Sequence, residues 1–96
     1  MTRSRIAVVT GGGTGIGAAI AHTLAASASV IVLVGRRQDR LDAMASEITA
    51  DHPGVTVHGR SVDLADIADV TTFIDWAHQE LPQVDVVVNN AGSAQP

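Results

Sequence analysis

A glycine-rich segment near the N-terminus has residue types and spacing suited to binding an anion. Its sequence, TGGGTGIG over residues 10–17, follows a short β-branched run and leads into a segment with helical periodicity. Such a turn lets the backbone approach a diphosphate closely, and the helix after it presents free N–H groups and a partial positive charge. The glycines could instead form a merely flexible turn, but the flanking strand and helix favour phosphate binding. A P-loop is excluded because it needs a lysine, and the chain contains none.

Arg36 and Arg37 stand where a dinucleotide-binding sheet recognises the adenine ribose. In NAD-binding sheets an acid at the end of the second strand holds the ribose 2′-hydroxyl. Here the apolar run over residues 30–34 is followed by Gly35 and the two arginines. An arginine can hold a 2′-phosphate bidentately, whereas a carboxylate would repel it. The pattern predicts NADP(H) in preference to NAD(H); the alternative is that these arginines and Arg40 are solvated charges at the start of a helix.

Four runs rich in valine and isoleucine predict the strands that would position these residues. They cover residues 6–10, 30–34, 55–58 and 85–88. All but the third are continuous apolar runs, which suit strands buried on both faces of a parallel sheet. The third run alternates and is the weakest.

The segments between these runs have apolar residues spaced by three and four, which predicts one apolar stripe on each of three helices. The stripes are Ile16, Ile20 and Leu24; Leu41, Met44 and Ile48; and Ile67, Val70, Ile74, Ala77 and Leu81. The order β-α-β-α-β-α-β predicts an α/β fold, a partial Rossmann-like doubly wound parallel sheet with strand order 3-2-1-4 and residues 1–96 as a single partial domain. The fourth strand would lie at an edge, where it could pair with its copy in another chain.

Composition excludes several classes of function. A formal net charge of −4 supplies no broad basic face, so neither nucleic acid nor an anionic membrane is an expected partner. No apolar stretch approaches the roughly 18 residues of a membrane span, and too few residues precede the first strand for a signal peptide. We therefore expect a cytoplasmic protein. With no cysteine and no metal-ligand spacing among the four histidines, we expect no metal site.

The chain resembles the short-chain dehydrogenase/reductase family over essentially its whole length. Residues 10–17 match the family's TGxxxGxG pattern, and residues 84–92, VDVVVNNAG, match its fourth strand and NNAG motif. One departure is Thr14, because NADP-preferring members often carry a basic residue at that position of the turn. The preference for NADP(H) therefore rests on Gly35 and Arg36.

The resemblance implies a set of cofactor-binding residues. Those at the diphosphate and the adjoining ribose would be Gly11, Gly13, Thr14, Gly15, Ile16 and Gly17. At the adenine, Asp63 would accept from the exocyclic amine and the N–H of Leu64 would reach a ring nitrogen. Asn90, Ala91 and Gly92 would lie near the adenine ribose. From the residues alone, Asp63 could equally be a helix cap or turn residue, and Asn89 with Asn90 a polar turn.

The family's chemistry uses an Asn, a Ser and a Tyr-x-x-x-Lys pair, in which the tyrosine exchanges a proton with the substrate oxygen. The chain contains no tyrosine and no lysine, so no catalytic residue is assigned and its activity as an enzyme is left open. One hypothesis is the NADP(H)-binding N-terminal portion of a carbonyl/alcohol oxidoreductase, truncated before its catalytic half. The other is a non-catalytic nucleotide-binding or interaction module built on half a Rossmann fold.

Overall fold

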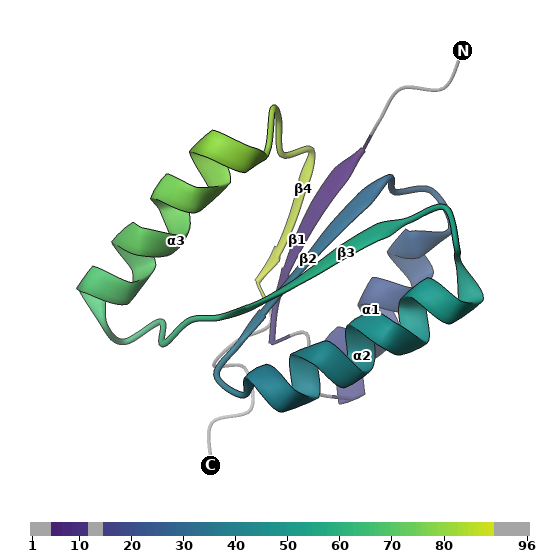
Figure 1. Cartoon of the computed structure of the whole chain (residues 1–96), viewed down its shortest axis with the longest axis horizontal. Helices are drawn as coiled ribbons and strands as arrows, with labels where there is room; N and C mark the ends of the chain where they lie inside the picture. The colour runs from purple at the N-terminus through teal and green to yellow at the C-terminus, as the bar shows by residue number, and fades with distance from the viewer. Residues whose placement is uncertain (1–4, 12–14, 90–96) are drawn as a thin grey trace.

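The computed structural model describes residues 5–11 and 15–89. In these ranges three helices alternate with four strands in the predicted order (Figure 1). The elements are β1 (Ile6–Thr10), α1 (Gly15–Ala25), β2 (Val30–Gly35), α2 (Gln38–Asp51), β3 (Thr56–Ser61), α3 (Ile67–Glu80) and β4 (Val86–Asn89). All strand pairs are parallel, and the order across the sheet is β3-β2-β1-β4. The Rossmann-like sheet and its predicted order 3-2-1-4 are therefore confirmed.

Strand β2 lies at the centre of the core. Helices α1 and α2 cover one face of the sheet and α3 covers the other (Figure 1). Because side chains alternate along a strand, Ile31 and Leu33 face α1 and α2 while Val32 and Val34 face the side of α3. All four side chains are fully buried. Each such burial stabilises the fold by about 1.5–3 kcal/mol before entropy is counted, which explains the uninterrupted apolar run.

Strand β3 is longer than predicted. The sequence pattern indicated residues 55–58, but the strand runs from Thr56 to Ser61 and pairs with β2 along its whole length. Ladder hydrogen bonds join backbone groups, so the polar end of this segment continues the strand despite its low β-propensity. Strand β4 begins one residue later than predicted, at Val86, and ends at Asn89.

The predicted apolar stripe of α1 is only partly correct, because Leu24 packs against the core cluster but Ile16 does not. The helix buries a seam of small residues, and Ile16 is 68% exposed. Ile20 and Leu24 are half-buried. The buried seam consists of Gly17, Ala18, Ala21 and Ala25. Small side chains let a helix approach the sheet closely, so the larger residues lie on its flanks.

The stripe of α2 is confirmed. Leu41 and Ile48 are fully buried, and Met44 packs against the same cluster. None of the helices in the described ranges is long and apolar enough to cross a membrane.

The predicted stripe of α3 is only partly correct. Its packed side includes Phe73 and Trp76 together with the expected Val70 and Ala77, and Leu81 just after the helix is buried as expected. Ile67 is 84% exposed and Ile74 is 44% exposed. The two aromatic rings carry more apolar surface than the isoleucines, so burying them favours a different rotation of the helix about its axis.

Candidate nucleotide-binding site

Gly11, the first residue after β1, has a backbone conformation that favours glycine. Gly11 has a φ of 71°, and its N–H donates to the Val34 carbonyl oxygen at 2.7 Å, which ties the turn to the end of β2. Helix α1 begins at Gly15, where an added Cβ would meet no heavy atom of the described chain within 4 Å. Ile16 is also exposed, so no residue of the described ranges covers the N-terminus of α1. Gly17 is buried in the seam against the sheet.

Five residues expected at the cofactor lie outside the described residues. They are Gly13 and Thr14 in the turn and Asn90, Ala91 and Gly92 after β4.

The loop between β2 and α2 is held in place by β3. The Ser61 hydroxyl donates to the Arg36 carbonyl oxygen at 3.0 Å. The Gln38 side chain donates through Nε2 to the Gly59 carbonyl oxygen at 2.9 Å and accepts from the Ser61 N–H at 3.1 Å. These contacts fix the backbone from which the arginines project. The sequence analysis missed Gln38 and Ser61, because only the β2–β3 register brings them together.

The three arginines of this loop differ in their partners. The Arg37 guanidinium donates to both carboxylate oxygens of Asp39, from Nε to Oδ1 at 3.3 Å and from Nη2 to Oδ2 at 2.9 Å. This hydrogen bonding holds the pKa of the Asp39 carboxyl below its usual range. Arg36 and Arg40 are exposed, and their guanidinium groups have no hydrogen bond or ion pair with any residue in the described ranges. The expected contact of Arg37 with a phosphate stays a prediction.

The loop between β3 and α3 is an ordered acidic turn. Asp66 caps α3 by accepting from the N–H groups of Ala68 and Asp69 at 3.0 and 3.4 Å. The Asp69 carboxylate instead accepts from the Asp63 N–H at 2.7 Å. Asp63 is half-buried, and its Oδ1 accepts from the Ala65 N–H at 3.0 Å. The turn interpretation of Asp63 is therefore correct, and this local bond engages one of its two carboxylate oxygens.

Strand β4 ends beside the glycine turn. The Thr10 hydroxyl lies 3.1 Å from Asn89 Oδ1 and 3.3 Å from the Val88 carbonyl oxygen. Asn89 is thus the last residue of a strand and is joined to the end of β1.

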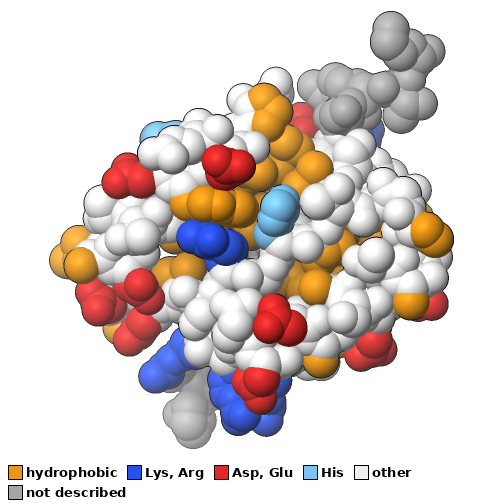
Figure 2. Space-filling model, viewed as in Figure 1, with side chains coloured by type: hydrophobic (Ala, Val, Ile, Leu, Met, Phe, Trp, Pro, Cys, Tyr) orange, Lys and Arg blue, Asp and Glu red, His pale blue; other side chains and the backbone are white. Residues whose placement is uncertain are grey.

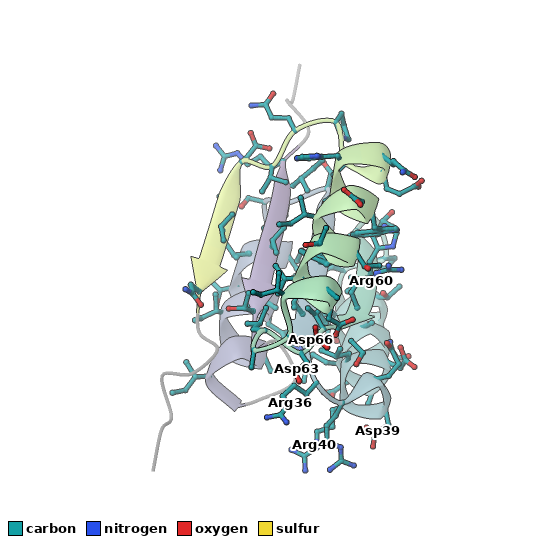
Figure 3. All side chains as sticks on the ribbon, turned by 90° about the vertical axis from the view of Figure 1, so that its left-hand side faces the viewer. Arg36, Asp39, Arg40, Arg60, Asp63 and Asp66 are labelled. Atoms are coloured by element: carbon teal, nitrogen blue, oxygen red, sulfur yellow. The ribbon has the colours of Figure 1, made fainter. Side chains whose placement is uncertain are left out.

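These loops share one end of the molecule because the carboxyl ends of parallel strands meet at the same edge of a sheet. Arg36, Arg40 and Asp63 lie together at this end, whereas Arg60 lies further along the sheet (Figure 3). Figure 2 shows basic side chains gathered at the end where α2 begins. The arrangement provides an open helix N-terminus, cations beside β2 and a carboxylate beside β3, which are groups that can hold a phosphorylated nucleotide.

Comparison with known proteins decides the family. The sequence model of the short chain dehydrogenase family matches residues 5–96 of this chain. The chain belongs to the short-chain dehydrogenase family. A 3α-hydroxysteroid dehydrogenase of Mediterraneibacter gnavus is 34% identical over 95 residues, which are 99% of this chain and 38% of that protein.

Two solved structures are also similar. L-sorbose reductase from Gluconobacter frateurii, solved with NADPH and L-sorbose, is 37% identical with a TM-score of 0.84 over 93% of this chain and 34% of its own. A metagenomic short-chain oxidoreductase in complex with NADP is 35% identical with a TM-score of 0.85 over 95% of this chain and 40% of its own. The chain thus spans between a third and two fifths of the length of these relatives.

Proposed function

We propose that this chain is the NADP(H)-binding, N-terminal portion of an oxidoreductase that transfers a hydride between the nicotinamide cofactor and a carbonyl or alcohol substrate. The observation that carries the proposal is the Arg36 guanidinium directly after β2, which is exposed and has no hydrogen bond or ion pair with a residue in the described ranges. The residue after β2 is where a dinucleotide sheet selects its ribose, and a guanidinium there favours the 2′-phosphate. The NADPH-bound and NADP-bound neighbours support the same cofactor.

The remaining expected contacts fit the same bound nucleotide. We propose that the diphosphate rests on the turn formed by Gly11, Gly13, Thr14, Gly15, Ile16 and Gly17. The open space at Gly15 supports this, because no described protein atom there requires a glycine. Asp63 and Leu64 would meet the adenine, with Asp63 Oδ2 accepting from its amine. Asn90, Ala91 and Gly92 would complete the ribose side.

The chemical step needs groups that these 96 residues do not contain. Proton exchange with the substrate oxygen in this family is carried out by a tyrosine next to a lysine, and the sequence has neither. In our proposal the chain supplies cofactor binding and orientation, and the bound cofactor supplies the hydride. The same absence favours a second candidate, a nucleotide-binding module that catalyses nothing. A cytoplasmic location and the absence of a nucleic-acid partner stay predictions from composition.

Calorimetric titration of the purified chain with NADPH and with NADH tests the proposal. We expect saturable binding of both, with NADPH bound more tightly. Equal affinities would contradict the cofactor preference, and no binding of either would contradict the nucleotide-binding function itself. Turnover of carbonyl compounds by the chain with NADPH would show that proton transfer does not need a Tyr-x-x-x-Lys pair.

A further inference from the structure

Strand β3 forms one edge of the described sheet, opposite the edge formed by β4 (Figure 1). The N–H groups of Thr56 and Val62 donate to carbonyl oxygens at or next to the two ends of β2. Because backbone groups alternate along a strand, the residues between them that face away from β2 are Val57, Gly59 and Ser61. Outward N–H and C=O groups of this kind are a template for pairing with another strand.

The side-chain amide of Gln38, the first residue of α2, lies on this edge. Its Nε2 donates to the Gly59 carbonyl oxygen at 2.9 Å, and its Oε1 accepts from the Ser61 N–H at 3.1 Å. A residue of an added parallel strand would make the same two bonds, donating to one residue of β3 and accepting from the residue two positions later. The amide therefore takes the place that backbone groups of a fifth strand would occupy.

Asp42 fixes the orientation of this amide. Gln38 Nε2 also donates to Asp42 Oδ1 at 2.8 Å, one turn further along α2. A carboxylate accepts hydrogen bonds, so the nitrogen of the amide faces Asp42 and its oxygen faces the Ser61 N–H. Both N–H groups and the oxygen of the amide are thus engaged, which holds the side chain at the edge of β3.

Gly59 lets α2 lie close enough to β3 for this contact. A Cβ added at Gly59 would lie 3.0 Å from Leu41 Cβ and 3.4 Å from Gln38 Nε2. Leu41 is fully buried in the core and has little room to move. A side chain at residue 59 would therefore push the start of α2 away from the strand.

We propose that Gln38 closes the β3 edge against strand addition by a second copy of this chain. The inference concerns self-association and does not rest on the proposed function. With β3 closed, β4 is the open edge among the described strands, and two copies joined through β4 present only closed edges. Association then ends at a dimer. With both edges open, each copy could add another at either side, and assembly would continue without closing.

Sedimentation velocity of the full chain over a series of concentrations tests the proposal. Gln38→Met keeps the length of the side chain but makes none of the three hydrogen bonds. We expect the parent chain to reach no more than twice the monomer mass, and Gln38→Met to form larger species at the same concentrations. Val87→Lys opposes pairing through β4. That variant alone should be a monomer, and Gln38→Met combined with it should reach a dimer through β3.

Three control variants separate closure of the edge from a loss of stability. Asp42→Ala leaves both bonds of Gln38 to β3 and should associate like the parent. Ile48→Val destabilises the buried core without changing the edge, and it should also match the parent. Thr56→Lys places a lysine at an exposed position of β3, so it should reverse the association of Gln38→Met.

Hydrogen exchange of the Ser61 N–H gives a second readout at concentrations where the chain is monomeric. Without the Gln38 oxygen this amide should exchange roughly tenfold faster, the scale of one lost hydrogen bond. The Val62 N–H donates to the Gly35 carbonyl oxygen and should not change. Circular dichroism verifies that each variant is folded, and Gln38→Ala repeats the test with a better helix former.

Two results would overturn the proposal. One is that folded Gln38→Met and Gln38→Ala associate no further than their parent chains, with and without Val87→Lys. The other is that Ile48→Val associates as strongly as Gln38→Met, because partial unfolding would then be the cause. Neither result bears on nucleotide binding.

Discussion

At the scale of single residues, the glycines at the two ends of the β1–α1 connection, Gly11 and Gly15, differ in what they accommodate. Gly11 adopts a left-handed backbone conformation with a φ of 71°. Gly15 lies at the start of α1 with open space where a Cβ would point. The protein's own conformation requires the first glycine, whereas a bound ligand would require the second.

Substitution of these glycines should therefore separate stability from binding. We expect Gly11→Ala to lower the free energy of unfolding by about 1–2 kcal/mol, because a Cβ is strained at positive φ. Gly15→Ala should not lower it, yet should weaken dinucleotide binding by filling the approach to the helix N-terminus. Urea unfolding and calorimetric titration of both variants measure the two effects. A Gly15→Ala chain that binds NADPH like the parent would contradict ligand approach at this residue.

The pair formed by Arg37 and Asp39 predicts a local pH dependence. Because the folded-state pKa of Asp39 is lowered by its hydrogen bonds to Arg37, the pair stabilises the folded state above the pKa of the unfolded chain. That contribution is lost as the pH falls through the lowered folded-state value, below about pH 4. NMR titration of the Asp39 carboxyl carbon should give a pKa below the usual range. In Arg37→Ala it should return to the ordinary value, and an unchanged pKa would show that Arg37 is not its cause.

At the scale of elements, the packing of α3 shows which of its side chains determine the side that faces the sheet. Phe73 and Trp76 pack toward the sheet. The Trp76 ring also contacts two residues of β3. The guanidinium carbon of Arg60 lies 4.3 Å from the centroid of the Trp76 ring, and the His58 ring meets the Trp76 ring edge-on. The exposed Ile67 makes no comparable contribution to the packed side. The aromatic contacts therefore set the rotation of the helix.

A pair of alanine substitutions tests this rotation. We expect Phe73→Ala to lower the free energy of unfolding by roughly 2 kcal/mol, somewhat less than for a fully buried phenylalanine. Ile67→Ala should change it by no more than about 0.5 kcal/mol, as for other surface substitutions. Chemical denaturation followed by circular dichroism measures both. Equal losses would mean that the packed side of α3 includes Ile67, as the sequence periodicity first predicted.

At the scale of the whole molecule, the two faces of the sheet are covered unequally. Val88 packs on the side of α1 and α2, whereas Val87 on the other side is 65% exposed. Apolar side chains reach the surface between α3 and the sheet (Figure 2). Among the described strands β4 also forms one edge of the sheet. An apolar edge strand of this kind is a template for pairing with another strand.

We therefore keep self-association through β4 as a prediction for the isolated chain. Light scattering should show a dimer whose fraction rises with protein concentration. Val87→Lys should shift the chain toward monomer, because lysine on an edge strand opposes pairing. Ala50→Lys adds the same charge on an exposed position of α2 and should not. A chain that stays monomeric at every concentration would remove this prediction.

Local sequence patterns were enough to predict the order of elements, the parallel sheet and the position of the connection between β1 and α1. These features depend on local patterns, since β-branched runs, helical spacing and glycines act within a few residues of themselves. The second strand, residues 30–34, is the clearest case, because a segment buried on both faces must be apolar throughout. The family motifs over residues 10–17 added the expected cofactor.

Which residues of each element contact which partners depends on packing in three dimensions. Periodicity shows that a helix has an apolar side, but the close fit of Ala21 to the sheet and the large rings of Phe73 and Trp76 fixed which side is buried. The sequence likewise does not show which of Arg36, Arg37 and Arg40 is paired with a carboxylate. Their different pairing depends on loop geometry held by contacts from β3, and electrostatic interactions at these distances depend on where each charge lies in space, not on its place along the chain.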